Sequence, residues 1–202
     1  MWLDVEQNTD VWHDLRLGKV TASGASSFMA NFGKAFGEPA NKYALSLALQ
    51  RVTRVKPESY TNEHMERGHA QEPIARMLYE SETFQEVTNG GFFDYDEYGC
   101  SPDGLIKNGA IEIKSVIAST HYATLQRGNF DPSYRWQIAS QLDCDGVEFV
   151  DFVSYCSEFP LAKQLLVYRI TRDDFKDELV KLRDRRAEFL ELVKKIEIEL
   201  KD

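Results

Sequence analysis

The chain has 202 residues, of which 43% are hydrophobic and 28% are charged, a composition typical of a soluble globular protein with a sizeable core. No apolar run approaches the roughly 18 residues of a membrane span, and the first residues lack the basic and apolar regions of a secretory signal. The formal net charge of −9 argues against a nucleic-acid partner, because phosphate groups are bound mainly by Lys and Arg.

Other bulk features limit the organisation of the chain. Three widely spaced cysteines fit neither a disulfide framework nor a zinc ribbon, so we expect a cytoplasmic protein. No internal repeat or flexible linker is present, which predicts a single domain over residues 1–202. Much of the acidic charge lies in residues 173–202, and an acidic metal site gains positive charge only when its ion binds. Local motifs must therefore decide whether DNA is a partner.

The elements are predicted in chain order from turn residues and hydrophobic periodicity. A first helix is expected to begin after Thr21, and residues 31–40 are expected to form a loop because they contain two Gly and one Pro. Residues 84–117 are predicted to form short strands, separated by Asn89-Gly90-Gly91 and by Asn108-Gly109. The remaining segments are helices at 41–54, 62–81, 133–143 and 173–202, and strands at 147–156 and 164–170. This order predicts an α/β (α+β) fold with one central mixed β-sheet flanked by helices.

The Asn108-Gly109 pair is the strongest local signal in the chain, because it is typical of a two-residue type I′ hairpin turn. Such a turn would place Asp103 opposite Lys114 on the neighbouring strand. Glu112 would lie on the same face, since side chains that are two residues apart in a strand point the same way. The hairpin therefore predicts that Asp103, Glu112 and Lys114 converge on one patch.

This patch is a candidate metal site. Two carboxylates at cross-strand distance suit Mg²⁺, with Mn²⁺ as a substitute and one or two ions per site. Such an ion would polarise a phosphoryl oxygen and make a water molecule more acidic, while Lys114 would position the water or stabilise charge on the phosphate. The same Glu-x-Lys pattern is also that of a solvated strand face with a cross-strand ion pair. From these residues alone both interpretations stay open.

Four segments, in order, resemble one group of nucleases. Asp103 followed by Glu112-Ile113-Lys114 resembles the core motif of the PD-(D/E)XK nuclease superfamily. Residues 12–23 resemble the entry motif of the phage lambda-type exonucleases, the viral recombinase or alkaline exonuclease branch of that superfamily. Residues 68–80 resemble the helix of that branch that carries a further acidic residue, and residues 134–142 resemble its glutamine-bearing helix. The matches follow the order of the family and cover about two thirds of the chain.

The resemblance implies an Mg²⁺-dependent deoxyribonuclease with a restriction-endonuclease-like core that digests double-stranded DNA from its ends. It implies digestion in the 5′ to 3′ direction, leaving a 3′ single strand for recombination by strand annealing. It further implies a ring-shaped homotrimer around the DNA and a single-strand annealing protein as partner. Two other functions stay open: a PD-(D/E)XK endonuclease or junction resolvase with the same core, and a non-catalytic DNA-end-binding scaffold, which the acidic net charge favours.

The resemblance also assigns roles to the residues of the core. Glu72 corresponds to the helix carboxylate near the metal ion, acting directly or through water. Asp103 and Glu112 correspond to the principal metal ligands, and the backbone carbonyl of Ile113 corresponds to an additional one. Lys114 corresponds to the catalytic lysine.

A second set of residues is assigned to DNA binding. Arg16 resembles the arginine that engages the 5′-terminal phosphate, and a guanidinium can hold phosphate through two hydrogen bonds. Thr21 and Ser23 would add donors at a helix N-terminus, although they are also suited to capping that helix. Gln137 corresponds to a glutamine close to the active site, and it also fits as an ordinary polar helix residue. Met65 lies near the position of an apolar wedge that splits the terminal base pair, and it is equally suited to core packing.

Overall fold

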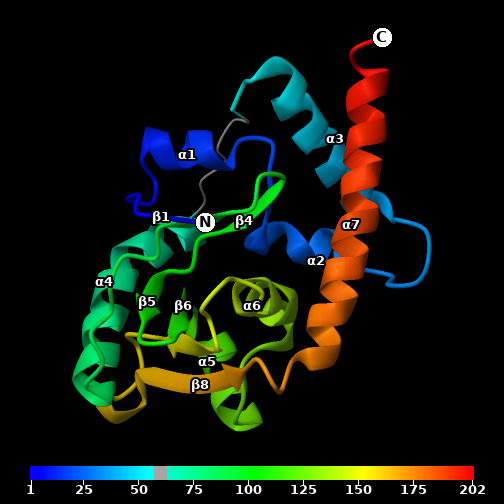
Figure 1. Cartoon of the computed structure of the whole chain (residues 1–202). Coiled ribbons are helices and arrows are strands. Elements are labelled where there is room, and N and C mark those ends of the chain that lie inside the picture. Colours follow the sequence, from blue (N-terminus) through cyan, green and yellow to red (C-terminus); the bar gives the residue numbers. More distant parts are fainter. Residues whose placement is uncertain (57–62) are drawn as a thin grey trace.

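The computed structural model describes residues 1–56 and 63–202, with the side chains of residues 63–65 outside that description. Two four-stranded mixed β-sheets form the centre of the chain, with helices packed around them (Figure 1). The α/β fold class is confirmed, but the single central sheet that we expected is divided into two sheets, with strand orders β1-β3-β4-β2 and β5-β6-β7-β8. The strands are β1 (Trp2–Leu3), β2 (Val20–Thr21), β3 (Phe92–Asp94), β4 (Tyr98–Cys100), β5 (Gly104–Ile106), β6 (Gly109–Ser115), β7 (Phe149–Tyr155) and β8 (Leu165–Thr171).

The helices cover both faces of the second sheet. One face contacts the helix α4, whereas α6 packs against the other face (Figure 1). The long helix α7 runs beside α3 and α6 at the edge of the molecule. None of the helices in the described part of the chain is long and apolar enough to cross a membrane. The helices are α1 (Asp10–Arg16), α2 (Ala25–Met29), α3 (Glu38–Thr53), α4 (Glu63–Thr83), α5 (Ala118–Arg127), α6 (Arg135–Leu142) and α7 (Lys176–Glu199).

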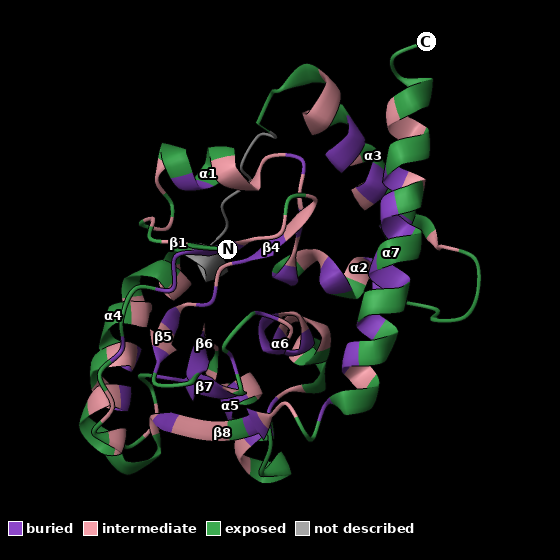
Figure 2. Cartoon of the chain, viewed as in Figure 1, coloured by how far each residue is buried: buried purple, intermediate pink, exposed green. Residues whose placement is uncertain are grey.

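Two hydrophobic cores hold these layers together. The larger core joins α2, α3, α6 and α7 to one face of the second sheet, and at its centre the Phe189 ring stacks 4.9 Å from Phe28 and 5.4 Å from Tyr43. The smaller core lies between α4 and the opposite face, where Tyr79 packs among apolar strand residues. Figure 2 shows the result on α7, whose buried and exposed residues alternate with the helical period.

The turn between β5 and β6 differs from the predicted one. Ile106 pairs with Gly109, so Lys107 and Asn108 form the turn, and the expected type I′ turn at Asn108-Gly109 is wrong. Asn108 adopts a left-handed φ of +60°, a conformation that Asn tolerates better than most residues, whereas Gly109 already belongs to β6. The ring of Phe149 on β7 occupies the space beside Gly109, where a Cβ would lie only 2.6 Å from it. Packing against the neighbouring strand therefore sets the register.

The observed register is shifted by two residues from the predicted one, so the predicted pairing of Asp103 with Lys114 is also wrong. Asp103 instead lies beside Ile111 and Ile113, and its backbone N–H donates to the carbonyl of Ile111 at 3.1 Å. A shift of two residues keeps every side chain on its face, whereas a shift of one would have reversed it. The expected grouping of Asp103, Glu112 and Lys114 therefore survives the error.

The helices predicted at 41–54, 62–81, 133–143 and 173–202 and the strands predicted at 147–156 and 164–170 are present, with boundaries displaced by a few residues. The helix expected after Thr21 is a short 3-10 turn (Ala22–Gly24) that continues into α2. Two helices were not predicted. α1 has only 7 residues, too few for a clear periodic pattern, and the buried face of α5 consists of His121 and Thr124 rather than apolar residues.

Candidate active site

Glu112 on β6 lies at the centre of the candidate site, and its side chain is fully buried. Both carboxylate oxygens have partners. Gln137 donates from Nε2 to Oε1 at 2.5 Å, and Gln141 donates from its own Nε2 to Oε2. The ammonium of Lys114 also contacts Oε1. Because residues four apart share a helix face, α6 can present both amides to one carboxylate and fix its orientation.

Asp103 follows β4 and immediately precedes β5, where it faces the cavity beside Glu112. Its Oδ2 accepts a hydrogen bond of 2.6 Å from the backbone N–H of Ile113. The pKa of the Asp103 carboxyl is raised well above its ordinary value, first by burial and then by the negative charge of Glu112, with Lys114 opposing the shift. Asp103 and Glu112 are thus close enough to repel each other in a buried site, and Lys114 partly compensates this repulsion.

Glu72 on α4 faces the same cavity, which has a volume of about 600 Å³. Burial raises the pKa of the Glu72 carboxyl and His69 lowers it, while the Glu112 charge adds to the upward shift. The position of α4 is fixed farther along the helix, where the buried Tyr79 hydroxyl donates to Oδ2 of Asp151 on β7 at 2.7 Å. The cavity is lined by Arg67, Gly68, His69, Glu72, Asp103, Ile113, Lys114, Ser115, Val116, Ile117, Thr120 and Tyr134.

The pKa of Lys114 reflects the same charges. Burial by itself lowers the pKa of this ammonium, but the carboxylates of Glu112 and Asp103 raise it more strongly, so that the net shift is upward. The ammonium also lies 5.1 Å from the centre of the Tyr134 ring, a cation–π arrangement. Lys114 is therefore the main positive charge that these two carboxylates share.

The donor set of the site suits a hard divalent cation. It consists of carboxylate oxygen atoms from Asp103 and Glu112. Glu72 faces the same cavity, and the backbone of Ile113 lies between Glu112 and Lys114 in β6. Among the described residues, no three acidic, His or Cys side chains are grouped closely enough to hold an ion by themselves. Mg²⁺ does not need three, since it is usually held by one or two carboxylates and keeps several waters. A bound cation would also offset the mutual charge repulsion of the carboxylates.

Arg16, at the end of α1, is attached to the segment that leads to Asp103. Its Nη1 donates to the hydroxyl of Ser101 at 3.2 Å, and the indole Nε1 of Trp12 donates to the same hydroxyl at 2.8 Å. The guanidinium also stacks 3.9 Å from the Trp12 ring centre. Burial lowers the pKa of Arg16. The arginine is thus hydrogen-bonded to Ser101, which lies two residues before the candidate metal ligand Asp103 in the chain.

Thr21 and Ser23 lie at the start of the next helical segment, and their hydroxyl oxygens are 3.4 Å apart. Thr21 precedes the 3-10 turn, but its side chain makes no capping hydrogen bond, and Gly24 occupies the cap position of α2. Ser23 opens onto a second, smaller cavity of about 170 Å³ beside Gln137. That cavity is lined by Ala22, Ser23, Ser26, Ser133, Tyr134 and Gln137.

The structure therefore groups the predicted residues in two neighbouring sets. Glu72, Asp103, Ile113 and Lys114 line the larger cavity around the buried Glu112. Arg16 lies beside Ser101, and the smaller cavity is lined by Ser23 and Gln137, with the Thr21 hydroxyl 3.4 Å from that of Ser23. The side chain of Met65 lies outside the described residues, so its proposed role as a wedge stays a prediction.

Gln141 was missed by the sequence prediction. It is 1% exposed, and its amide contacts the buried Glu112. The available signal was its spacing of four residues from Gln137, which places both glutamines on one face of the predicted helix. That spacing shows a shared face but not what the face contacts, because the partner lies 29 residues away in the sequence.

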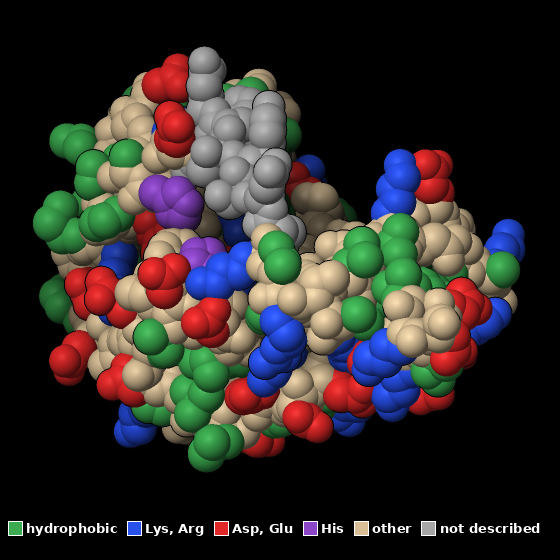
Figure 3. All heavy atoms as spheres, turned by 90° about the horizontal axis from the view of Figure 1, so that it is seen from above, with side chains coloured by type: hydrophobic (Ala, Val, Ile, Leu, Met, Phe, Trp, Pro, Cys, Tyr) green, Lys and Arg blue, Asp and Glu red, His purple; other side chains and the backbone are tan. Residues whose placement is uncertain are grey.

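The larger cavity carries charges of both signs, because Arg67 and Lys114 line it together with Glu72 and Asp103. The face shown in Figure 3 carries Lys, Arg and His side chains among the acidic ones. Part of the negative charge lies on α7, where it is paired with basic residues, as in the 2.6 Å contact between Lys201 and Glu197. The formal net charge of −9 therefore does not exclude an anionic ligand at the candidate site.

Comparison with known proteins gives consistent matches. The sequence matches the model of the YqaJ-like viral recombinase domain over residues 11–148. The structure is similar to an alkaline exonuclease (LHK-Exo) from Laribacter hongkongensis, with 34% identity, a TM-score of 0.85 and coverage of 96% of each chain. It is also similar to LHK-Exo in complex with dAMP, with 33% identity, a TM-score of 0.81 and coverage of 95% of this chain and 98% of that chain.

A more distant match shows the fold alone. This is a phage related exonuclease from Haemophilus somnus 129PT, with 11% identity, a TM-score of 0.71 and coverage of 93% of this chain and 99% of that chain. Comparison with curated protein sequences finds no match. Because the family model covers more than half of the chain and LHK-Exo matches almost all of it, the chain belongs to the YqaJ-like viral recombinase family and groups with the alkaline exonucleases among the deoxyribonucleases.

Proposed function

We propose that the chain is a Mg²⁺-dependent exonuclease that digests double-stranded DNA from its ends in the 5′ to 3′ direction. The observation that carries this proposal is the convergence of Asp103, Glu112, Lys114 and Glu72 around one cavity. The family and the similarity to LHK-Exo, which has a structure in complex with dAMP, support a nucleic-acid substrate. The resulting 3′ single strand would be the substrate for recombination by annealing.

Asp103 and Glu112 are the proposed ligands of the cation, with the Ile113 carbonyl as a third oxygen. When bound, Mg²⁺ supplies polarisation of a phosphoryl oxygen and makes a water molecule more acidic. Gln137 and Gln141 hold the Glu112 carboxylate in one orientation, so its geometry is set before the ligand arrives. Mn²⁺ has similar ligand preferences and is the proposed substitute.

Lys114 and Glu72 act on the reacting groups from two sides of the cavity. The ammonium of Lys114 stabilises the negative charge that develops on the phosphate during attack. Glu72 orients a water molecule by accepting a hydrogen bond from it. Both roles use side chains that face the cavity and need no change in the fold.

Arg16, Thr21 and Ser23 are the proposed binding residues for the 5′-terminal phosphate. Arg16 supplies a guanidinium with five N–H donors, of which one is used by the Ser101 hydroxyl. The Ser23 hydroxyl lines the smaller cavity, and the Thr21 hydroxyl, 3.4 Å from it, adds a second donor. A phosphate held there would bring the first phosphodiester bond of that strand toward Glu112, since Gln137 borders the cavity and contacts this carboxylate.

We propose that the working assembly is a ring-shaped homotrimer and that a single-strand annealing protein is its partner. Both proposals are supported by family likeness and not by contacts within this chain. Light scattering at micromolar concentration should give three times the mass of one chain. A monomer mass would overturn the trimer without affecting the chemistry of the site.

The proposed function is tested by digestion of two duplexes, one linear with a single 5′-phosphorylated end and one covalently closed and circular. We expect digestion of the linear duplex in Mg²⁺, no digestion in EDTA, and no digestion of the circle. Cleavage of the closed circle would identify an endonuclease or a junction resolvase instead. Binding of DNA ends without any cleavage in Mg²⁺ or Mn²⁺ would identify a non-catalytic scaffold.

A further inference from the structure

The turn that follows α1 is held from two sides by α3. The backbone N–H of Gly18 donates to Oε1 of Gln50 at 3.0 Å, and Nε of Arg51 donates to the carbonyl oxygen of Gly18 at 2.7 Å. Gly18 has a φ of +71°, and a Cβ at this position would lie 2.7 Å from Cγ of Arg51. The close approach and the positive φ both favour glycine. The position of this turn is therefore tied to the position of α3.

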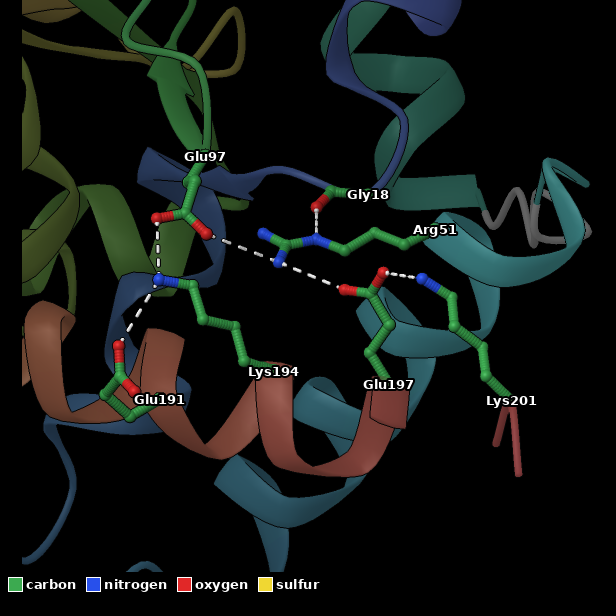
Figure 4. A network of polar contacts seen from close by, with 7 residues as sticks. All are labelled: Gly18, Arg51, Glu97, Glu191, Lys194, Glu197 and Lys201. Atoms are coloured by element: carbon green, nitrogen blue, oxygen red, sulfur yellow. Dashed lines mark hydrogen bonds and ion pairs between the residues drawn. The ribbon is translucent and has the colours of Figure 1, made fainter. Parts of the chain in front are cut away.

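Arg51 is in turn held by carboxylates from two distant parts of the chain (Figure 4). Its Nη1 lies 3.5 Å from Glu97 in the turn between β3 and β4, and 3.6 Å from Glu197 near the end of α7. The Arg51 side chain is only 16% exposed, so these charges are screened less than a surface pair. Lys194 contacts Glu97 and Lys201 contacts Glu197, which orients both carboxylates. The last turns of α7 therefore help to orient the Arg51 side chain so that its Nε faces the carbonyl oxygen of Gly18.

The Gly18 turn connects the residues assigned to the DNA end. Arg16 lies two residues before it, and Thr21 lies three residues after it. The backbone N–H of Thr21 donates to the hydroxyl of Tyr43 at 3.0 Å. Tyr43 and Gln50 are seven residues apart on α3, which is about two helical turns, so they lie on the same side of the helix. α3 therefore contacts the segment both at Gly18 and at Thr21.

We infer that Gln50 and Arg51 are positioning residues for recognition of the 5′-phosphorylated end, and that Glu197 of α7 supports Arg51 in this role. They fix the N–H and the carbonyl of Gly18, and thereby the direction in which Arg16 and the Thr21 segment face the DNA. This inference rests on the proposed function and deepens it. It also gives the acidic C-terminal helix, far in sequence from the motifs, a specific connection to the site.

The first test compares Glu197→Ala with Glu199→Ala. Both substitutions remove one carboxylate from α7, but Glu199 pairs with Lys195 at 3.9 Å and is 63% exposed, whereas Glu197 contacts Arg51. The measured quantity is the ratio of kcat/KM for a duplex with a 5′-phosphorylated end to that for a duplex with a 5′-hydroxyl end. We expect Glu197→Ala to lower this ratio and Glu199→Ala to leave it at the wild-type value.

The second test distinguishes the loss of the hydrogen-bond acceptor at residue 50 from a change in the size of the side chain. Gln50→Leu removes the acceptor for the Gly18 N–H, whereas Gln50→Glu replaces the amide oxygen with a carboxylate oxygen that accepts the same hydrogen bond. We expect Gln50→Leu to lower the ratio about fivefold to tenfold, the effect of one lost hydrogen bond, with kcat at saturating DNA nearly unchanged. Gln50→Glu should retain most of the wild-type ratio. A merely structural contact would lower the unfolding temperature without changing the ratio.

A readout independent of activity uses the indole N–H of Trp12, which donates to Ser101 beside Arg16. Its NMR resonance should shift in Gln50→Leu and Glu197→Ala, and should stay in place in Glu199→Ala. An unchanged Trp12 resonance together with an unchanged ratio would overturn the inference. Digestion by the wild type without any preference for a 5′ phosphate would also overturn it, while leaving the nuclease function intact. If the wild type digests no DNA, the proposed function fails, and the Trp12 resonance still decides whether the segment is positioned by α3.

Discussion

Gln141 donates a hydrogen bond to Oε2 of Glu112, and both side chains are almost completely buried. Gln137, one helical turn earlier, donates to the other oxygen of the same carboxylate. Two amides from one helix therefore fix a carboxylate that a neighbouring strand supplies. A buried carboxylate with both oxygens engaged cannot rotate freely, so helix α6 determines the shape of the candidate metal site.

The first prediction concerns Gln141→Leu, which removes the donor and leaves Oε2 of Glu112 buried without its partner. We expect a loss of about 1–3 kcal/mol in the free energy of unfolding, measured in urea. We also expect Mg²⁺ affinity to fall by roughly 10–100-fold in calorimetric titration, as for other groups that orient metal ligands. Ser140→Ala is the matched control, because its hydroxyl bonds the Trp136 carbonyl. Equal Mg²⁺ affinities in the two variants would contradict the account.

The second prediction concerns Asp103→Asn, which removes one of the clustered carboxylates without changing the size of the side chain. In EDTA the variant should unfold at a higher temperature than the wild type, because the negative charges of Asp103 and Glu112 oppose each other in the folded chain. In Mg²⁺ the order should reverse, since only the wild type gains stability from ion binding. Thermal unfolding in both buffers measures this. A Mg²⁺-induced rise of the same size in both proteins would exclude Asp103 as a ligand.

The third prediction concerns the packing between α7 and the larger core. Phe189→Ala removes a ring that stacks on Phe28 and Tyr43, so we expect a loss of about 3–5 kcal/mol in the free energy of unfolding. Val180→Ala on the same helix should change it by less than about 0.5 kcal/mol, because Val180 is exposed. Urea unfolding of both variants gives the comparison. Similar losses would show that α7 is not anchored through Phe189.

The fourth prediction concerns the hairpin register. Asn108→Val should cost about 1–2 kcal/mol, because a β-branched residue is disfavoured at φ +60°. Gly109→Ala should also destabilise the fold, but for a different reason, since its Cβ would meet the Phe149 ring. The loss caused by Gly109→Ala should therefore shrink in a Phe149→Leu background, whereas the loss caused by Asn108→Val should not. If the Phe149→Leu background leaves both losses unchanged, the register described above is wrong.

The sequence was sufficient to group Asp103, Glu112 and Lys114, because strand alternation depends only on the parity of the spacing. It was not sufficient for the exact register, because the deciding contact is with Phe149 on a strand that is 40 residues from Gly109 in the numbering. A local turn signal cannot include such a contact.

The same limit explains the other omissions. Gln141 is an unremarkable polar residue until the fold brings it to Glu112, and Gly18 is an ordinary turn glycine until α3 packs against it. α5 was missed because its buried His121 bonds Ser154 and the Lys163 carbonyl, which gives the helix a polar buried face. Periodicity detects faces that are apolar, and these positions are buried through hydrogen bonds instead.

Single-turnover digestion of a duplex that carries a label on its 5′-phosphorylated terminal nucleotide tests both the role of Lys114 and the direction of digestion. Wild type, Lys114→Met and Lys107→Met are compared in Mg²⁺, since Lys107 is an exposed lysine in the turn of the same hairpin. We expect the wild type and Lys107→Met to release the labelled mononucleotide first, and Lys114→Met to release none. Release of the label by Lys114→Met at the wild-type rate would show that Lys114 is not catalytic. Release of the label last by the wild type would show that digestion does not begin at the 5′ end.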